Sequence, residues 1–113
     1  MAFHQIDTET VTSATSTVTL TGINTNDVYA VVMTNVKVGT DARSVSMRVT
    51  KSGSADTTSN YDYAYKSFNA TGGFGDGAFT NHSSFRYLVA DNIGTGTGEA
   101  ANAIIYLHSF NNA

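Results

Sequence analysis

Histidines and carboxylates are the side chains of this sequence that could perform acid–base or metal chemistry. His4, His82 and His108 are far apart in the sequence, and none has the spacing of a metal-ligand pair. The nine carboxylates stand mostly in turn-like segments, where an Asp side chain usually hydrogen-bonds the local backbone. They are Asp7, Glu9, Asp27, Asp41, Asp56, Asp62, Asp76, Asp91 and Glu99. No nucleophile, base and orienting group can be selected together, so we expect no catalytic residue, no cofactor and no bound metal, and therefore no enzyme.

A glycine-rich stretch at residues 72–77 has some likeness to a phosphate-binding loop. It lacks the Lys and the Ser or Thr of such a loop, and no helix is expected after it. Asp76 alone offers too few oxygen ligands for calcium. The four glycines of residues 69–77 predict a plain loop over the whole stretch.

Tyr61, Tyr63 and Tyr65 form the most suggestive row, because alternate residues of a strand share one face. Such tyrosines can stack on sugars or anchor a protein interface. The opposite parity carries Asp62 and Lys66, which favours the inner face of the fold for the tyrosines. The candidate interface or ligand residues of the whole chain are Tyr61, Tyr63, Tyr65, Phe74, Phe79, Tyr106 and Phe110.

Period-2 alternation of apolar residues predicts the elements that must position these side chains. The predicted strands cover residues 15–23, 28–38, 45–49, 61–68, 85–89 and 103–110. The second and the last of them are apolar on both parities, which is typical of strands covered on both faces. Residues 51–60 hold no periodic apolar position and predict a long polar loop. No segment has the 3.6-residue periodicity of a helix.

Short strands separated by turn clusters predict an all-β fold, an antiparallel β-sandwich of jelly-roll type with about six or seven short strands. With 113 residues, we expect one domain over 1–113, in which 1–14 form an extended N-terminal arm. Such a sandwich has exposed edge strands, and the chain contains no Pro and few charges to protect them. The sequence therefore predicts a homo-oligomer.

Charge and composition limit the classes of partner that we expect. The formal net charge is −3 and charged residues make up only 13% of the chain, which argues against a nucleic-acid partner. Cys is absent, so neither a disulfide nor a thiolate metal site is expected. The sequence shows no signal peptide and no apolar run of membrane-spanning length, so we expect a soluble chain made in the cytoplasm, with no membrane partner.

The order of these features resembles small structural proteins, of decoration or tail type, from tailed bacteriophages, especially phages of aquatic bacteria. The resemblance rests on the Thr-rich segment 17–23, the apolar segment 28–38, residues 45–49 with the polar loop into Asn60-Tyr61-Asp62-Tyr63, the glycine-rich stretch, and Gly98-Glu99 leading into Asn102-Ala103-Ile104-Ile105-Tyr106-Leu107. This chain stops soon after that last segment, where similar proteins often continue through further strands.

The resemblance implies a virion structural protein made in the host cytoplasm, most simply a capsid decoration or cement protein. Such a protein would associate with itself, with a trimer favoured, and would bind the major capsid protein or other virion proteins. The alternative is a carbohydrate- or receptor-binding module of a tail fibre or spike, which would bind glycans through exposed tyrosines or through the loop around Phe74 and Phe79.

Overall fold

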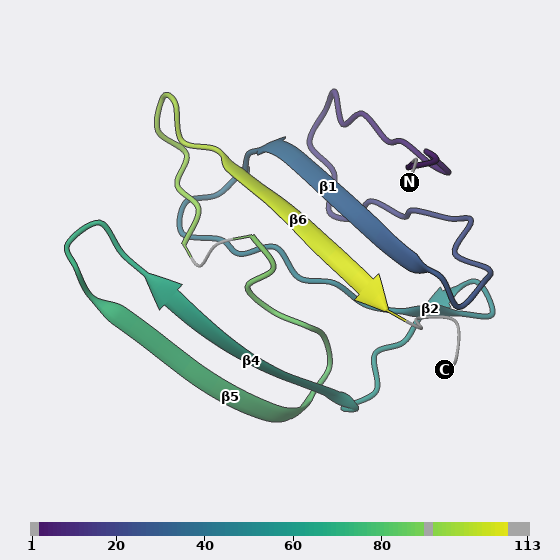
Figure 1. The fold of residues 1–113 in the computed structure, drawn as a ribbon. Helices are drawn as coiled ribbons and strands as arrows, with labels where there is room; N and C mark the ends of the chain where they lie inside the picture. Colours follow the sequence, from purple (N-terminus) through teal and green to yellow (C-terminus); the bar gives the residue numbers. More distant parts are fainter. Residues whose placement is uncertain (1–2, 90–91, 109–113) are drawn as a thin grey trace. The chain divides into compact units, whose positions relative to one another are not determined.

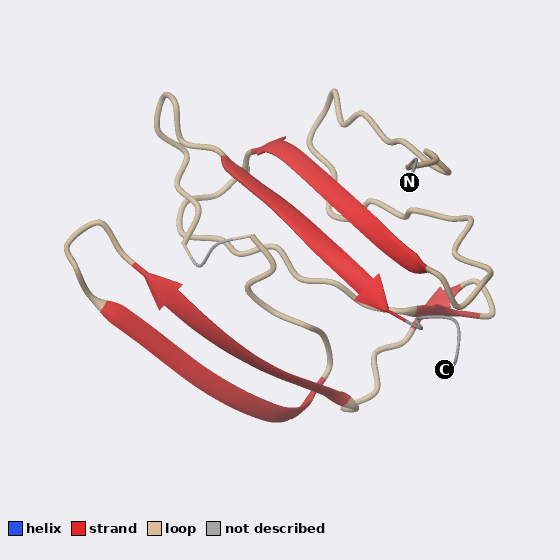
Figure 2. Ribbon diagram, in the orientation of Figure 1, coloured by secondary structure: helices blue, strands red, loops and turns tan. Residues whose placement is uncertain are grey.

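The computed structural model describes residues 3–89 and 92–108, and within them all regular structure is β (Figures 1 and 2). Six strands are present and no described residue is helical. They are β1 (Val28–Val36), β2 (Thr50–Lys51), β3 (Ser54–Ala55), β4 (Tyr61–Phe68), β5 (Phe74–His82) and β6 (Ala101–His108). The all-β prediction is confirmed.

The strands form three separate two-stranded antiparallel sheets, with β1 beside β6, β2 beside β3, and β4 beside β5. The chain divides into two compact units, residues 1–34 with 102–113, and residues 35–101. The first unit contains nearly all of the β1–β6 sheet, and the second contains the other two sheets. The expectation of one domain over 1–113 stays a prediction.

Predicted strand 61–68 is present as β4 with the same bounds, and predicted strand 28–38 is present as β1, which ends two residues earlier. Predicted strand 103–110 is present as β6, which begins two residues earlier; residues 109–110 lie outside the described residues. The predicted strand over residues 15–23 is wrong, because these residues are irregular and nearly all exposed. The Thr15 hydroxyl donates to the Thr17 carbonyl (3.1 Å), so threonine satisfies the backbone locally and competes with strand pairing. In the arm expected at 1–14, Asp7 accepts a hydrogen bond from the Thr21 amide at 2.7 Å.

The predicted strands 45–49 and 85–89 are replaced by irregular segments that touch at isolated antiparallel bridges. Met47 and Phe85 exchange two backbone hydrogen bonds of 2.9 and 3.0 Å, and Arg43 is bridged to Ile93 in the same way. Tyr87 has a φ of +61°, which no regular strand allows, so pairing beyond Phe85 is reduced to one irregular hydrogen bond, from the Leu88 amide to the Val45 carbonyl (3.1 Å). The pairing of the two segments is real, but it is too short to form strands.

Three strands lie wholly or partly where the sequence predicted loops. The polar loop 51–60 begins with the β2–β3 hairpin, whose turn residues Ser52 and Gly53 both have positive φ (50° and 80°), as a two-residue type I′ hairpin turn requires. The glycine-rich loop 69–77 ends at Gly73, because β5 starts at Phe74. Asn69 closes the β4–β5 turn, since its side-chain oxygen accepts from the Gly73 amide at 2.6 Å.

Little apolar surface is buried. Among the described residues, the buried apolar side chains are Tyr61, Ile93 and Leu107. In β1 and β6 alternate residues are half-buried and exposed, so the expectation that these strands are covered on both faces is wrong. In the β1–β6 sheet, one face is therefore partly covered and the other face is exposed.

Candidate functional site

The inner face of the β4–β5 hairpin carries a cluster of aromatic rings, which we call the aromatic cluster: Tyr63, Tyr65, Phe79, His82 and Tyr87. Phe79 is stacked on Tyr63, with ring centroids 5.0 Å apart, and lies parallel to Tyr65 at 6.2 Å. Tyr87 packs edge-on against Tyr65 at 5.4 Å. The rings are half-buried, so the tyrosine row lies on the more covered face, as the charged opposite parity indicated.

A β-bulge brings His82 into the aromatic cluster. Tyr61 pairs with His82 and Tyr63 pairs with Phe79, so β5 holds one more residue than β4 between these pairs. Asn81 has a φ of +59° at the bulge, and its amide donates to Asp62 at 2.9 Å. The extra residue puts His82 on the same face as Phe79. Its ring lies edge-on to Tyr63 at 5.4 Å.

Tyr61 has a structural role that its sequence pattern did not reveal. Its ring packs edge-on against Phe85 at 5.0 Å, and its hydroxyl accepts from the Val49 amide (3.1 Å) and donates to the Asp56 carbonyl (2.9 Å). These two backbone groups flank the β2–β3 hairpin. Tyr61 is therefore not available to a ligand.

The Tyr63 hydroxyl is buried and has no hydrogen-bond partner in the described part of the chain. Burial raises the pKa of Tyr63, while the positive charge of Arg86 acts in the opposite direction. A buried phenol without a partner carries a desolvation cost, so this hydroxyl does not stabilise the hairpin.

Phe74 lies on the other face of the hairpin and is fully separate from the aromatic cluster. It pairs with Phe68 across the β4–β5 turn, and the two rings meet edge-on at 5.2 Å. Phe68 is 76% exposed and Phe74 is 80% exposed. The sequence analysis missed Phe68, although its symmetrical position on the other side of the Asn69–Gly73 turn could have indicated it.

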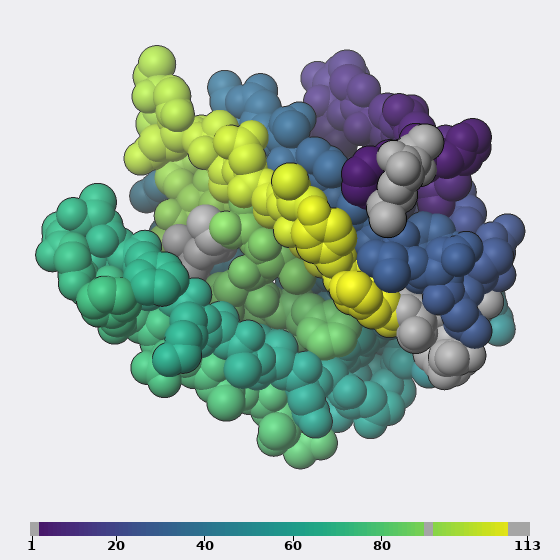
Figure 3. Space-filling model, in the orientation of Figure 1, coloured from purple at the N-terminus to yellow at the C-terminus, as the bar shows by residue number. Residues whose placement is uncertain are grey.

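Tyr106 lies on an exposed apolar face of the β1–β6 sheet, which we call the β1–β6 face. Exposed fractions of about 60% occur at Val28 (60%), Val32 (62%), Ile104 (61%) and Tyr106 (58%). The two strands run side by side in Figure 1, and β6 lies open at the surface in the view of Figure 3. Phe110, another candidate of the sequence analysis, lies outside the described residues.

The titratable residues are dispersed. Within residues 3–89 and 92–108, no group of three or more His, Cys, Asp or Glu residues could hold a metal ion. His4 is in an irregular segment, His82 packs on tyrosine and His108 ends β6. Turn carboxylates do bond the local backbone as expected: the Asp56 side chain accepts from the amide and the hydroxyl of Thr58, and these bonds lower its pKa. The described part of the chain also contains no helix able to cross a membrane.

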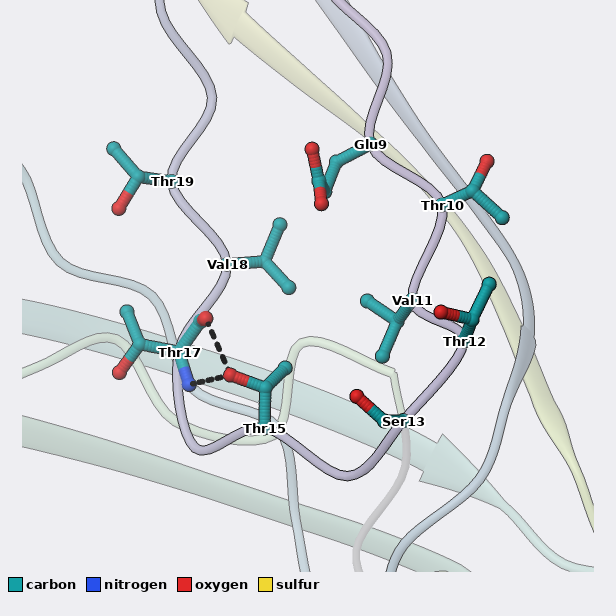
Figure 4. A pocket seen from close by; sticks show the side chains of 9 residues that line it. All are labelled: Glu9, Thr10, Val11, Thr12, Ser13, Thr15, Thr17, Val18 and Thr19. Atoms are coloured by element: carbon teal, nitrogen blue, oxygen red, sulfur yellow. Dashed lines mark hydrogen bonds between the residues drawn. The ribbon is translucent and has the colours of Figure 1, made fainter.

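The described residues form open hollows, two of which have largely polar linings. The first lies in the Thr-rich N-terminal part of the chain, where Glu9, Val11 and Val18 point into the space between two irregular chain segments (Figure 4). Threonines and one serine make up the rest of its lining, so it holds a single carboxylate and no base or nucleophile pair. The second lies in the 35–101 unit and is lined by Ala42, Arg43, Ser44, Ser46, Arg86 and Asn92.

These features define the chain, over its described residues, as an all-β protein of small antiparallel sheets with exposed aromatic and aliphatic surface. Comparisons with protein families, with curated proteins and with solved structures found no match.

Proposed function

We propose that this chain is a non-enzymatic structural subunit of a bacteriophage virion, a capsid decoration or cement protein that associates with itself and binds the capsid shell. The observation that supports self-association is the exposed apolar β1–β6 face on a sheet of only two strands. An isolated two-stranded sheet is at best marginally stable in water. A second sheet from a neighbouring subunit would cover this face and complete a β-sandwich.

The edges of the β1–β6 sheet support the same proposal. A sheet of two strands has an edge strand on each side, and an unpaired edge can pair with another chain. We therefore favour a homo-oligomer with more than one contact for each subunit, for which a trimer is the simplest closed form.

The first experiment measures mass and capsid binding together. Size-exclusion chromatography with light scattering should give an oligomer, and the oligomer should sediment with capsids that lack decoration. Val32→Lys places a charge on the β1–β6 face and should give a monomer, whereas Thr80→Lys, at an exposed polar position of β5, should not. The proposal is contradicted if the unsubstituted chain is a stable monomer that does not bind capsids. It is also contradicted if the chain turns over an ester, glycoside or phosphate substrate.

The exposed Phe68–Phe74 pair favours the second candidate, a carbohydrate- or receptor-binding module of a tail fibre or spike. Aromatic rings that project from a hairpin end can stack on sugar rings. The tyrosine row suits this role less well, because Tyr61 is buried and Tyr63 and Tyr65 are half-buried. Glycan-array binding that is lost in Phe74→Ala and kept in Thr71→Ala supports the module, and an array without signal counts against it.

A further inference from the structure

The end of the β4–β5 hairpin presents two aromatic rings to solvent. Phe68 is the last residue of β4, Phe74 is the first residue of β5, and the two residues pair across the turn. Both side chains are more exposed (76% and 80%) than the four apolar residues of the β1–β6 face. Residues 67–75 contain no Asp, Glu, Lys or Arg. The hairpin end is therefore an uncharged projection that carries two rings.

Hydrogen bonds within the turn hold the two phenylalanines in place. The Asn69 amide donates to the Gly73 carbonyl at 3.1 Å, and the Gly72 amide donates to the Asn69 carbonyl at 3.1 Å. The Thr71 hydroxyl donates to the side-chain oxygen of Asn69 at 2.9 Å. Polar groups that are already hydrogen-bonded cost little to bury, and a preorganised surface loses little conformational entropy on binding. The hairpin end is therefore suited to burial against an apolar surface.

The β1–β6 face is an apolar surface of the matching kind. Strands β1 and β6 contain no Asp, Glu, Lys or Arg. The exposed Val28, Val32 and Ile104 are aliphatic, and Tyr106 adds a ring. Aromatic rings can be buried on such a face without removing water from a charged group, and both surfaces leave water together.

The symmetry of a trimer limits what can cover the β1–β6 face. Two copies of this face packed on each other form a two-fold contact, which closes as a dimer and leaves Phe68 and Phe74 exposed. A closed ring of three subunits instead needs a contact between two different surfaces of the chain. A contact between the hairpin end and the β1–β6 face meets this requirement and covers both exposed apolar surfaces at once.

We propose that the Phe68–Phe74 pair of one subunit packs on the β1–β6 face of the next subunit, so that the subunits join head to tail. This inference rests on the self-association proposed above, and it names the surface that covers the β1–β6 face. The β4–β5 sheet of the neighbour is then the second layer over that face. Each subunit makes two contacts, one through each sheet, and three subunits close the ring.

Disulfide cross-linking tests this contact directly, because the chain contains no cysteine. Full-length Val32→Cys and Phe74→Cys are co-expressed, purified under reducing conditions and then oxidised. We expect a disulfide between the two variants, identified by mass spectrometry of the linked peptides, and the same result with Phe68→Cys in place of Phe74→Cys. Thr80→Cys is the matched control: it is also an exposed residue of β5, but it lies about 20 Å along the strand from Phe74 and should not link to Val32→Cys.

The head-to-tail contact is contradicted if an oligomer forms and neither phenylalanine variant links to Val32→Cys. It is also contradicted if Val32→Cys links efficiently to itself, as a two-fold contact predicts, or if Phe3→Cys, at a ring that is 85% exposed in the N-terminal segment, links in place of Phe74→Cys. A disulfide within one chain of the double variant Val32→Cys/Phe74→Cys would mean that the hairpin end covers its own subunit, which overturns the contact as well. These results leave self-association standing, whereas a monomeric unsubstituted chain contradicts the self-association itself.

Discussion

At the scale of single residues, two tyrosine hydroxyls two positions apart have opposite environments. The Tyr61 hydroxyl makes two backbone hydrogen bonds, to Val49 and Asp56, and the Tyr63 hydroxyl makes none among the described residues. Both point from the same face of β4, so their sequence pattern is identical. The segments around each hydroxyl, and not the sequence pattern, decide that the Tyr61 hydroxyl is hydrogen-bonded and that the Tyr63 hydroxyl is buried without a partner among the described residues.

Tyr61→Phe and Tyr63→Phe should therefore have different effects on the free energy of unfolding. Removing the Tyr61 hydroxyl leaves the Val49 amide and the Asp56 carbonyl without this partner and should lower the free energy of unfolding by about 1–2 kcal/mol. Removing the Tyr63 hydroxyl should leave the free energy of unfolding unchanged or raise it. Urea denaturation followed by tyrosine fluorescence measures both, and a stability loss in Tyr63→Phe equal to that in Tyr61→Phe contradicts this assignment.

Asp56 should make the stability of the folded chain depend on pH. Hydrogen bonds from Thr58 lower its pKa below the ordinary 3.8, with a smaller contribution from Lys51, 3.5 Å away. A carboxylate whose pKa is lowered by folding stabilises the folded state above its unfolded pKa, and this contribution is lost as the pH falls through the folded pKa. Thermal melting between pH 5 and pH 2 should show a smaller drop in Asp56→Asn than in the unsubstituted chain. An identical drop in both would contradict the role of Asp56.

At the scale of elements, the β4–β5 hairpin depends on a glycine that the sequence presents as loop-forming. Gly77 pairs with Tyr65, and a Cβ built on Gly77 would lie 2.8 Å from a ring carbon of Tyr65 and 2.8 Å from one of Phe79. The rings of the aromatic cluster cover this glycine, which compensates for the weak strand propensity of a residue without a side chain. Glycine is therefore required here for close approach.

Gly77→Ala should destabilise the chain by about 1–3 kcal/mol, since the rings must move to accommodate a methyl group. Gly39→Ala is the control, because a Cβ at Gly39 meets nothing within 4 Å. Thermal unfolding followed by near-ultraviolet circular dichroism reports both the stability and the tyrosine packing. A loss of stability no greater in Gly77→Ala than in Gly39→Ala would show that the rings do not pack on this glycine.

At the scale of the whole molecule, assembly through the exposed apolar β1–β6 face leads to an expectation about protein concentration. If the subunits stabilise one another, the melting temperature rises with protein concentration, because association is linked to folding by mass action. Scanning calorimetry over a hundredfold range of concentration should show this rise for the unsubstituted chain and a smaller one for Val32→Lys. A melting temperature that stays constant over the whole range contradicts assembly through the β1–β6 face.

The sequence by itself determined the β class, because the short apolar runs at β1 and β6, the alternation along β4 and the absence of helical periodicity do not depend on distant contacts. It also favoured the more covered face for the tyrosine row, since charged residues of the opposite parity are costly to bury. In both cases the deciding information lies within a few residues of the chain.

Tertiary structure alone decided which extended segments become strands and which side chains meet. The alternation of residues 15–23 is as regular as that of β4, yet a strand needs hydrogen-bonding partners, and these residues pair with no neighbouring strand in the described part of the chain. The Thr15 hydroxyl instead bonds the Thr17 carbonyl. Phe74–Gly77 becomes strand because its glycines lie opposite Tyr65 and Ser67. Arg43 and Arg86 line one hollow because backbone pairing joins Arg43 to Ile93 and Met47 to Phe85, which are 50 and 38 positions apart in the sequence, and no local pattern records such a pairing.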